Sequence, residues 1–130
     1  MNREYSSLFK ESSNDNKLPL LKRVEIKKYI HKKSAELNKM YKTDSRLDGS
    51  DGKRGSFKAE TIDFISKDRH GQSLINVIFA MGQEQYFNFD TKFWKDLGDK
   101  MKADLNKIVP IEKVIIGDDI ASLCFIYKAE

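Results

Sequence analysis

Two stretches of the chain place apolar residues at helical spacing, and this pattern constrains the fold more than any other. In residues 19–42 six apolar side chains share one arc about 120° wide, as expected of a helix with one buried stripe: Ile26, Tyr29, Ile30, Leu37, Met40 and Tyr41. Residues 91–108 repeat the pattern at i, i+3 and i+4 spacing in Phe93, Trp94, Leu97, Met101, Leu105 and Ile108. Two such helices need a common layer against which both stripes are buried.

Strand-like runs supply that layer. Residues 57–66, 73–81 and 85–89 are separated by turn-forming residues and predict a three-stranded meander. Residues 111–116 and 120–128 flank a Gly-Asp-Asp turn and predict a hairpin. The predicted fold class is α+β: a single domain in the order α-β-β-β-α-β-β, whose antiparallel sheet is packed by two amphipathic helices. The sequence suggests no internal repeat.

Four residues have specific expected places in this fold. Asp90 is expected to cap the second helix. Gly98, in the middle of that helix, costs about 1 kcal/mol relative to alanine and predicts a close approach to the sheet. Lys33 falls inside the apolar arc of the first helix, so we expect it at the edge of the buried stripe. Cys124 lies on the last strand, where an interior thiol usually acts as a small apolar side chain.

Domain organisation follows from local composition. Residues 1–17 are polar and are predicted to form a flexible lead, and residues 18–130 are predicted to form the single domain. Residues 43–56 contain three glycines and almost no apolar side chains, which predicts a mobile basic loop.

The expected location is cytoplasmic. Cys124 is the only cysteine, so no internal disulfide can form, and this favours a reducing compartment. The N-terminal residues lack the apolar core of a signal peptide. The longest apolar run, residues 75–81, is far shorter than the roughly 20 residues of a membrane span, so no membrane partner is expected.

Positive charge is concentrated in one part of the chain. Residues 17–58 hold 13 Lys/Arg and 5 Asp/Glu, an excess of +8 in a chain of net charge +4. Seven basic residues there are candidates for contact with the phosphate backbone of DNA or RNA: Lys28, Lys32, Lys39, Arg46, Lys53, Arg54 and Lys58. A competing interpretation is that these residues form a solvated face.

Aromatic residues near the second helix also have two interpretations. On a strand, Tyr86, Phe87 and Phe89 would offer a stacking surface for bases. They would instead belong to the core if they pack beneath the second helix with Trp94.

The stretch at 86–105, YFNFDTKFWKDLGDKMKADL, resembles the strand-then-helix end of single-stranded-DNA-binding transcriptional coactivators and of PUR-type repeats. That resemblance implies a curved antiparallel sheet that binds the nucleic-acid strand. Many folds share its elements, so neither family is assigned. The element order is also similar to that of double-stranded-RNA-binding domains, whose second helix has a basic start that is missing here.

No constellation for catalysis or metal binding is found in the sequence. His31 falls on the polar side of the first helix and His70 in a predicted turn, and neither has a nucleophile nearby in the sequence. One cysteine and two histidines that are distant in the sequence do not form a typical set of zinc ligands. We therefore predict a non-enzymatic binding protein without a cofactor or metal.

The alternative to nucleic acid is an acidic protein surface or another protein partner, as for an inhibitor, an immunity or anti-defence factor, or a phage or secretion assembly component. In that case the final hairpin would offer an edge strand.

Overall fold

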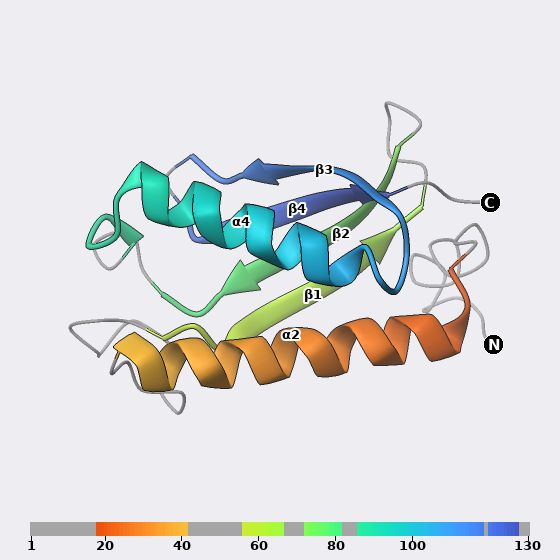
Figure 1. Ribbon diagram of the computed structural model, residues 1–130, viewed down its shortest axis with the longest axis horizontal. Coiled ribbons are helices and arrows are strands. Elements are labelled where there is room, and N and C mark those ends of the chain that lie inside the picture. The colour runs from red at the N-terminus through yellow and green to blue at the C-terminus, as the bar shows by residue number, and fades with distance from the viewer. Residues whose placement is uncertain (1–17, 42–55, 67–71, 82–85, 119, 128–130) are drawn as a thin grey trace, which may run out of the picture.

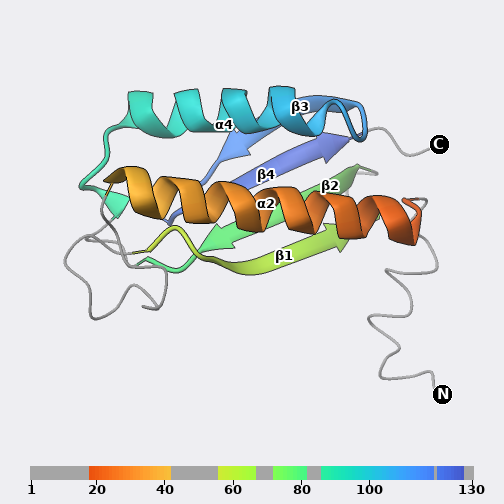
Figure 2. The same cartoon turned by 60° about the horizontal axis from the view of Figure 1, so that its bottom comes forward.

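The computed structural model (Figure 1) describes residues 18–41, 56–66, 72–81, 86–118 and 120–127. Within these ranges the elements are α2 (Leu20–Tyr41), β1 (Ala59–Ile65), β2 (Ser73–Phe79), α4 (Thr91–Leu105), β3 (Ile111–Ile116) and β4 (Ser122–Tyr127). The strands form one antiparallel sheet in the order β1-β2-β4-β3. Both helices lie side by side on one face of the sheet and run in opposite directions (Figures 1 and 2). The predicted α+β class, with an antiparallel sheet packed by two helices, is confirmed.

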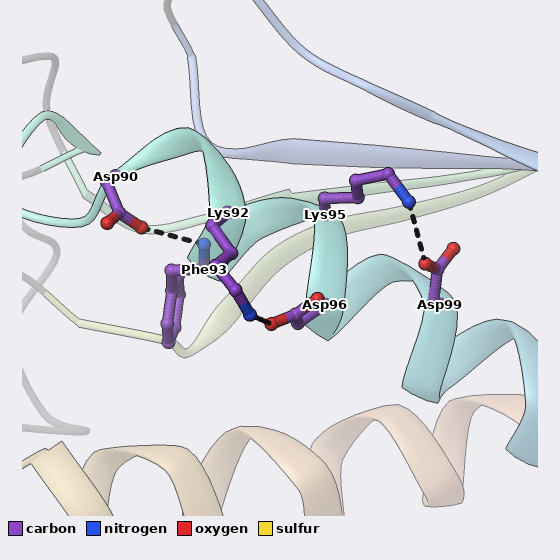
Figure 3. Close-up of polar contacts among 6 residues, drawn as sticks. All are labelled: Asp90, Lys92, Phe93, Lys95, Asp96 and Asp99. Carbon is purple, nitrogen blue, oxygen red and sulfur yellow. Dashed lines mark hydrogen bonds and ion pairs between the residues drawn. The ribbon is translucent and has the colours of Figure 1, made fainter.

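Helix α4 forms where the spacing of its apolar residues predicts it. The side chain of Asp90 caps its first turn, because the Asp90 carboxylate accepts a hydrogen bond from the backbone N–H of Phe93 at 2.8 Å (Figure 3). The helix buries one stripe against the sheet: Trp94, Leu97, Gly98, Met101 and Leu105. It ends at Leu105 rather than at Ile108, and the residues that follow form a turn toward β3.

The buried stripe of helix α2 is turned around the helix axis relative to the predicted one and includes Ser34 and Asn38. Ile26, Ile30 and Leu37 are buried, whereas the predicted core residue Met40 is 63% exposed. The Lys33 side chain is 15% exposed and lies 3.8 Å from the Glu36 carboxylate, at the edge of the buried stripe as predicted. Met40 was placed wrongly because the buried stripe extends toward Ser34 and Asn38, on the side of the helix away from Met40.

Gly98 brings α4 close to the sheet, as its position predicts. A Cβ atom at this residue would lie 3.4 Å from both γ-methyl groups of Val114 and 3.5 Å from the Cδ2 atom of Leu123. These are contact distances, so a side chain larger than a methyl group would push the helix off β3 and β4.

The predicted third strand at 85–89 is wrong. Its described residues, 86–89, form a helical turn, closed by a hydrogen bond from the N–H of Phe89 to the carbonyl of Tyr86 at 3.2 Å. The turn is held by Trp94, whose indole N–H donates to the same carbonyl at 3.2 Å and whose ring stacks on Tyr86 at 5.1 Å. Burial of the aromatic rings on Trp94 therefore overrides the strand propensity of this short segment.

The element order is the unit α-β-β used twice. The second strands of the two units, β2 and β4, pair antiparallel at the centre of the sheet, and β1 and β3 lie at its edges. Each edge strand has a register shift at the same place, between Ala59 and Thr61 in β1 and between Ile111 and Lys113 in β3. The two halves are thus related by an approximate two-fold axis between β2 and β4.

A short sequence match accompanies this symmetry. The last two turns of helix α2 contain Ala-Glu-Leu-Asn-Lys at 35–39, and Ala-Asp-Leu-Asn-Lys at 103–107 spans the C-terminal end of α4. In both copies the leucine is buried, and the asparagine accepts a hydrogen bond at 2.8 Å from a backbone N–H leading into the next strand. The expectation of no internal repeat is therefore wrong. The repeat is obscured because the chain from α2 to β1 spans residues 42–58, whereas that from α4 to β3 spans only 106–110.

The two asparagines give a stability prediction. The bond from Asn38 to the N–H of Phe57 is buried, and the bond from Asn106 to the N–H of Ile111 is only partly buried. Because an unsatisfied buried donor costs about 1–3 kcal/mol, we expect Asn38→Ala to lower the free energy of unfolding by that amount. Asn106→Ala should cost less, since water can replace its bond. Urea unfolding checks this, and an equal or larger loss for Asn106→Ala would contradict it.

Candidate functional site

Three of the predicted contact lysines form a row on the outer side of α2. Lys28, Lys32 and Lys39 are all exposed, and at 100° per residue they fall within about 40° of one another. The row covers about 17 Å along the helix axis at 1.5 Å per residue. We call Lys28, Lys32 and Lys39 the α2 lysine row.

Of the other four predicted contact residues, the structure describes only Lys58. Lys58 is exposed and follows Phe57, whose N–H is bound by Asn38, so it lies near the C-terminal end of α2. Arg46, Lys53 and Arg54 lie outside the described residues. The structure thus brings Lys58 to the same end of α2 as Lys39.

The two helices differ in how their lysines are neutralised. Helix α4 has four lysines and three aspartates, and its exposed faces carry i,i+4 ion pairs: Lys92–Asp96 at 2.6 Å, Lys95–Asp99 at 3.2 Å and Lys100–Asp104 at 3.5 Å. Figure 3 shows the first two of these pairs. Helix α2 has seven Lys/Arg and only two Glu. Among the described residues, the α2 lysine row forms no ion pair, so its charge faces solvent.

A groove of about 400 Å³ lies between α2 and α4. We call it the interhelical groove; it is lined by Tyr29, Lys32, Lys33, Glu36, Lys100, Asp104, Lys107 and Ile108. Four lysines and two acidic residues therefore line it, and Lys32 belongs to both this groove and the α2 lysine row. At the end of the groove near Ile108, the Lys22 ammonium donates to the Ile108 carbonyl at 2.8 Å and links the start of α2 to the turn that follows α4.

Tyr29 and Asp104 join the two walls of the groove. The Tyr29 hydroxyl donates to the Oδ2 atom of Asp104 at 2.5 Å. Burial would raise the pKa of Asp104, but the hydrogen bond from Tyr29 and the ammonium groups of Lys100 and Lys33 hold that pKa below its usual value. Burial, together with the bond to Asp104, raises the pKa of Tyr29. Asp104 is therefore ionised and Tyr29 neutral at neutral pH.

This contact predicts a pH-dependent effect of Tyr29→Phe. The variant should lose about 1.5–3 kcal/mol of unfolding free energy at pH 7, as for a hydrogen bond to a charged group. Because the pKa of Asp104 is lowered by folding, this stabilisation is present above the ordinary carboxyl pKa of about 4 and is lost as the pH falls through the lower folded-state value. Urea unfolding of both proteins at pH 7 and pH 2 measures the difference. A difference that is the same at both pH values would contradict the prediction.

The predicted aromatic stacking surface is not present. Tyr86 is buried against Trp94, and Phe89 is half-buried with its ring 4.5 Å from that of Phe93. Of the three predicted residues only Phe87 is well exposed, at 63%. The interpretation that these aromatic rings belong to the core is therefore confirmed for Tyr86 and Phe89.

Residues considered for catalysis or metal binding are dispersed. His31 is exposed on α2, and His70 lies outside the described residues. Cys124 is half-buried on the interior strand β4, where its register neighbours are Asn76 and Ile115. Within the part of the chain that the structure describes, no three His, Cys, Asp or Glu side chains are grouped closely enough to hold a metal ion. No helix there is long and apolar enough to cross a membrane.

Sequence reasoning missed most residues of the interhelical groove, and only Lys32 was a candidate. Tyr29 was assigned to the buried stripe, and Lys100, Asp104 and Lys107 were given no role. The repeated Leu-Asn-Lys sequence that includes Lys107 was the one available signal, since a repeat brings two helices into equivalent places on one sheet. Comparison of the chain with protein-family models, with curated proteins and with solved structures gave no match.

Proposed function

We propose that this chain is a non-enzymatic nucleic-acid-binding protein whose contact surface is the outer side of α2. The observation that supports this most is the contrast between the helices: three of the four lysines of α4 are paired with aspartates, and among the described residues the α2 lysine row is not. Unpaired lysines in a row suit a phosphate backbone, which presents regularly spaced negative charge. Each phosphate that a lysine neutralises releases condensed counterions, and this release favours binding.

The composition of this surface favours nucleic acid over an acidic protein. Protein interfaces usually have a desolvated centre of aromatic and apolar side chains, in which lysine is depleted. Between Lys28 and Lys39 the exposed side of α2 carries charged and polar residues and the small side chain of Ala35, whereas Ile30 and Leu37 are buried. Long, fully hydrated ammonium groups contact phosphates without that desolvation.

A salt titration tests the proposal. Binding of fluorescent single-stranded DNA, double-stranded DNA and RNA should weaken as salt rises, with a linear dependence of log K on log salt concentration. Three contacts from the α2 lysine row would contribute about 2–3 to the slope. Absence of binding to all three at low salt, or binding that is insensitive to salt, would overturn the proposal.

A protein partner remains the second candidate, and one observation favours it. At the start of α2, before the lysine row, three apolar residues are exposed: Leu20, Leu21 and Val24. Exposed apolar clusters often belong to protein contacts. Edge strand β3, which the final hairpin provides as predicted, also exposes Ile115. Leu21→Ser would weaken a protein complex and leave salt-dependent binding of nucleic acid unchanged, so this variant separates the two candidates.

A further inference from the structure

The interhelical groove has more positive charge than its carboxylates neutralise. Lys32 and Lys33 face it from α2, and Lys100 and Lys107 face it from α4 and the turn that follows. The lining contains four lysines and two acidic residues, Glu36 and Asp104, so it carries a net charge of +2.

Both carboxylates are already engaged. Glu36 lies 3.8 Å from the Lys33 ammonium, and the Oδ1 atom of Asp104 lies 3.5 Å from that of Lys100. The other oxygen of Asp104 accepts the hydrogen bond from Tyr29.

Two ammonium groups are thus left without a carboxylate among the described residues. They are those of Lys32 and Lys107, and they belong to opposite walls of the groove. A ligand between the walls would meet one unpaired ammonium group from each.

We propose that the interhelical groove binds a phosphate monoester, either the terminal phosphate of a nucleic-acid strand or the phosphate of a free nucleotide. For the strand end, this rests on the proposed function. A phosphate monoester carries about −1.5 to −2 charges at pH 7, which matches two ammonium groups. An internal phosphodiester or a single carboxylate carries one charge and would leave one lysine unneutralised.

The size and lining of the groove fit such a ligand. Its volume of about 400 Å³ is within the range of small-ligand sites, roughly 300–1,000 Å³. The half-buried ring of Tyr29 and the partly buried Ile108 offer apolar surface beside the charges. A sugar attached to the phosphate could lie against that surface while the lysines, which are common phosphate binders, hold the phosphate itself.

The test compares two oligonucleotides of one sequence, one with a 5′-phosphate and one with a 5′-hydroxyl. The phosphorylated strand should bind the unmodified protein about 5- to 10-fold more tightly, as expected for one or two added ionic contacts. This gain should vanish in Lys32→Gln/Lys107→Gln. It should persist in the matched control Lys92→Gln/Lys95→Gln, which removes the same charge from the exposed side of α4.

A second arm uses small probes and nuclear magnetic resonance. Adenosine monophosphate should shift the amide signals of residues 29–36 and 100–108, and adenosine should not. If the nucleotide does so but neither oligonucleotide binds, the groove proposal stands and the nucleic-acid function fails.

Three results would overturn the groove proposal. If both oligonucleotides bind equally with a normal salt dependence and adenosine monophosphate shifts none of these signals, the groove binds no phosphate monoester, while the nucleic-acid function stands. Retention of the phosphate gain in Lys32→Gln/Lys107→Gln would place the terminal phosphate elsewhere. A glutamate peptide that shifts the same signals as strongly as the nucleotide would make the groove a site for acidic protein segments.

Discussion

Replacement of Trp94 with alanine is expected to lower the free energy of unfolding by about 3–5 kcal/mol, as for other large aromatic residues in protein cores. Trp94 is 1% exposed and lies among the rings of Phe57, Phe79 and Tyr86 at centroid distances of 5.1–6.3 Å. The loss has two sources: a cavity beneath α4, and release of the Tyr86 carbonyl from the indole N–H that holds the turn at 86–89.

Phe87→Ala provides the control for this prediction. Phe87 belongs to the same turn and contacts the ring of Tyr86 at 4.9 Å, but it is 63% exposed. Its loss should cost about 1 kcal/mol or less. Thermal or urea unfolding of both variants checks the difference. If Trp94→Ala unfolds like the unmodified protein, the aromatic cluster does not stabilise the fold.

The sequence predicted the elements whose signals are local. The buried stripe of α4 extends over about three turns, and Asp90 stands where a cap is needed, so the helix follows from spacing and capping alone. The hairpin of β3 and β4 also follows from local features, because two apolar runs flank a turn at Gly117. A Cβ atom at Gly117 would lie 2.6 Å from the Ile120 carbonyl, which explains why this turn requires glycine.

What the sequence could not predict depends on contacts between distant segments. Residues 86–89 have the composition of a strand, and only the position of Trp94 beneath them makes a turn more favourable. The interhelical groove needs α2 and α4 side by side, which no spacing within either helix reveals. Tyr29 and Asp104 are 75 residues apart in the chain, so their contact follows from the two-fold arrangement of the α-β-β units.

Removal of charge from the α2 lysine row should have the largest effect on binding. We expect Lys28→Gln/Lys32→Gln/Lys39→Gln to weaken nucleic-acid binding by about 10- to 100-fold at low salt, because each lysine would neutralise one phosphate. Folding should change little, since all three side chains are exposed and glutamine has nearly the helix propensity of lysine.

The matched control removes three charges from α4. Lys92→Gln/Lys95→Gln/Lys102→Gln gives the same net charge as the α2 variant, but its lysines lie on the helix whose lysines are largely paired with aspartates. A general loss of positive charge would weaken binding equally in both variants. If α2 is a specific contact surface, the α2 variant should bind nucleic acid more weakly than the α4 variant.

The most direct measurement is therefore the salt slope of DNA binding for the unmodified protein and the two triple variants. The α2 variant should reduce the slope by about 2.7 for double-stranded DNA, at 0.9 for each lost phosphate contact, and the α4 variant should leave it nearly unchanged. Equal slopes in all three proteins, or a larger reduction in the α4 variant, would contradict the assignment of α2 as the nucleic-acid contact surface.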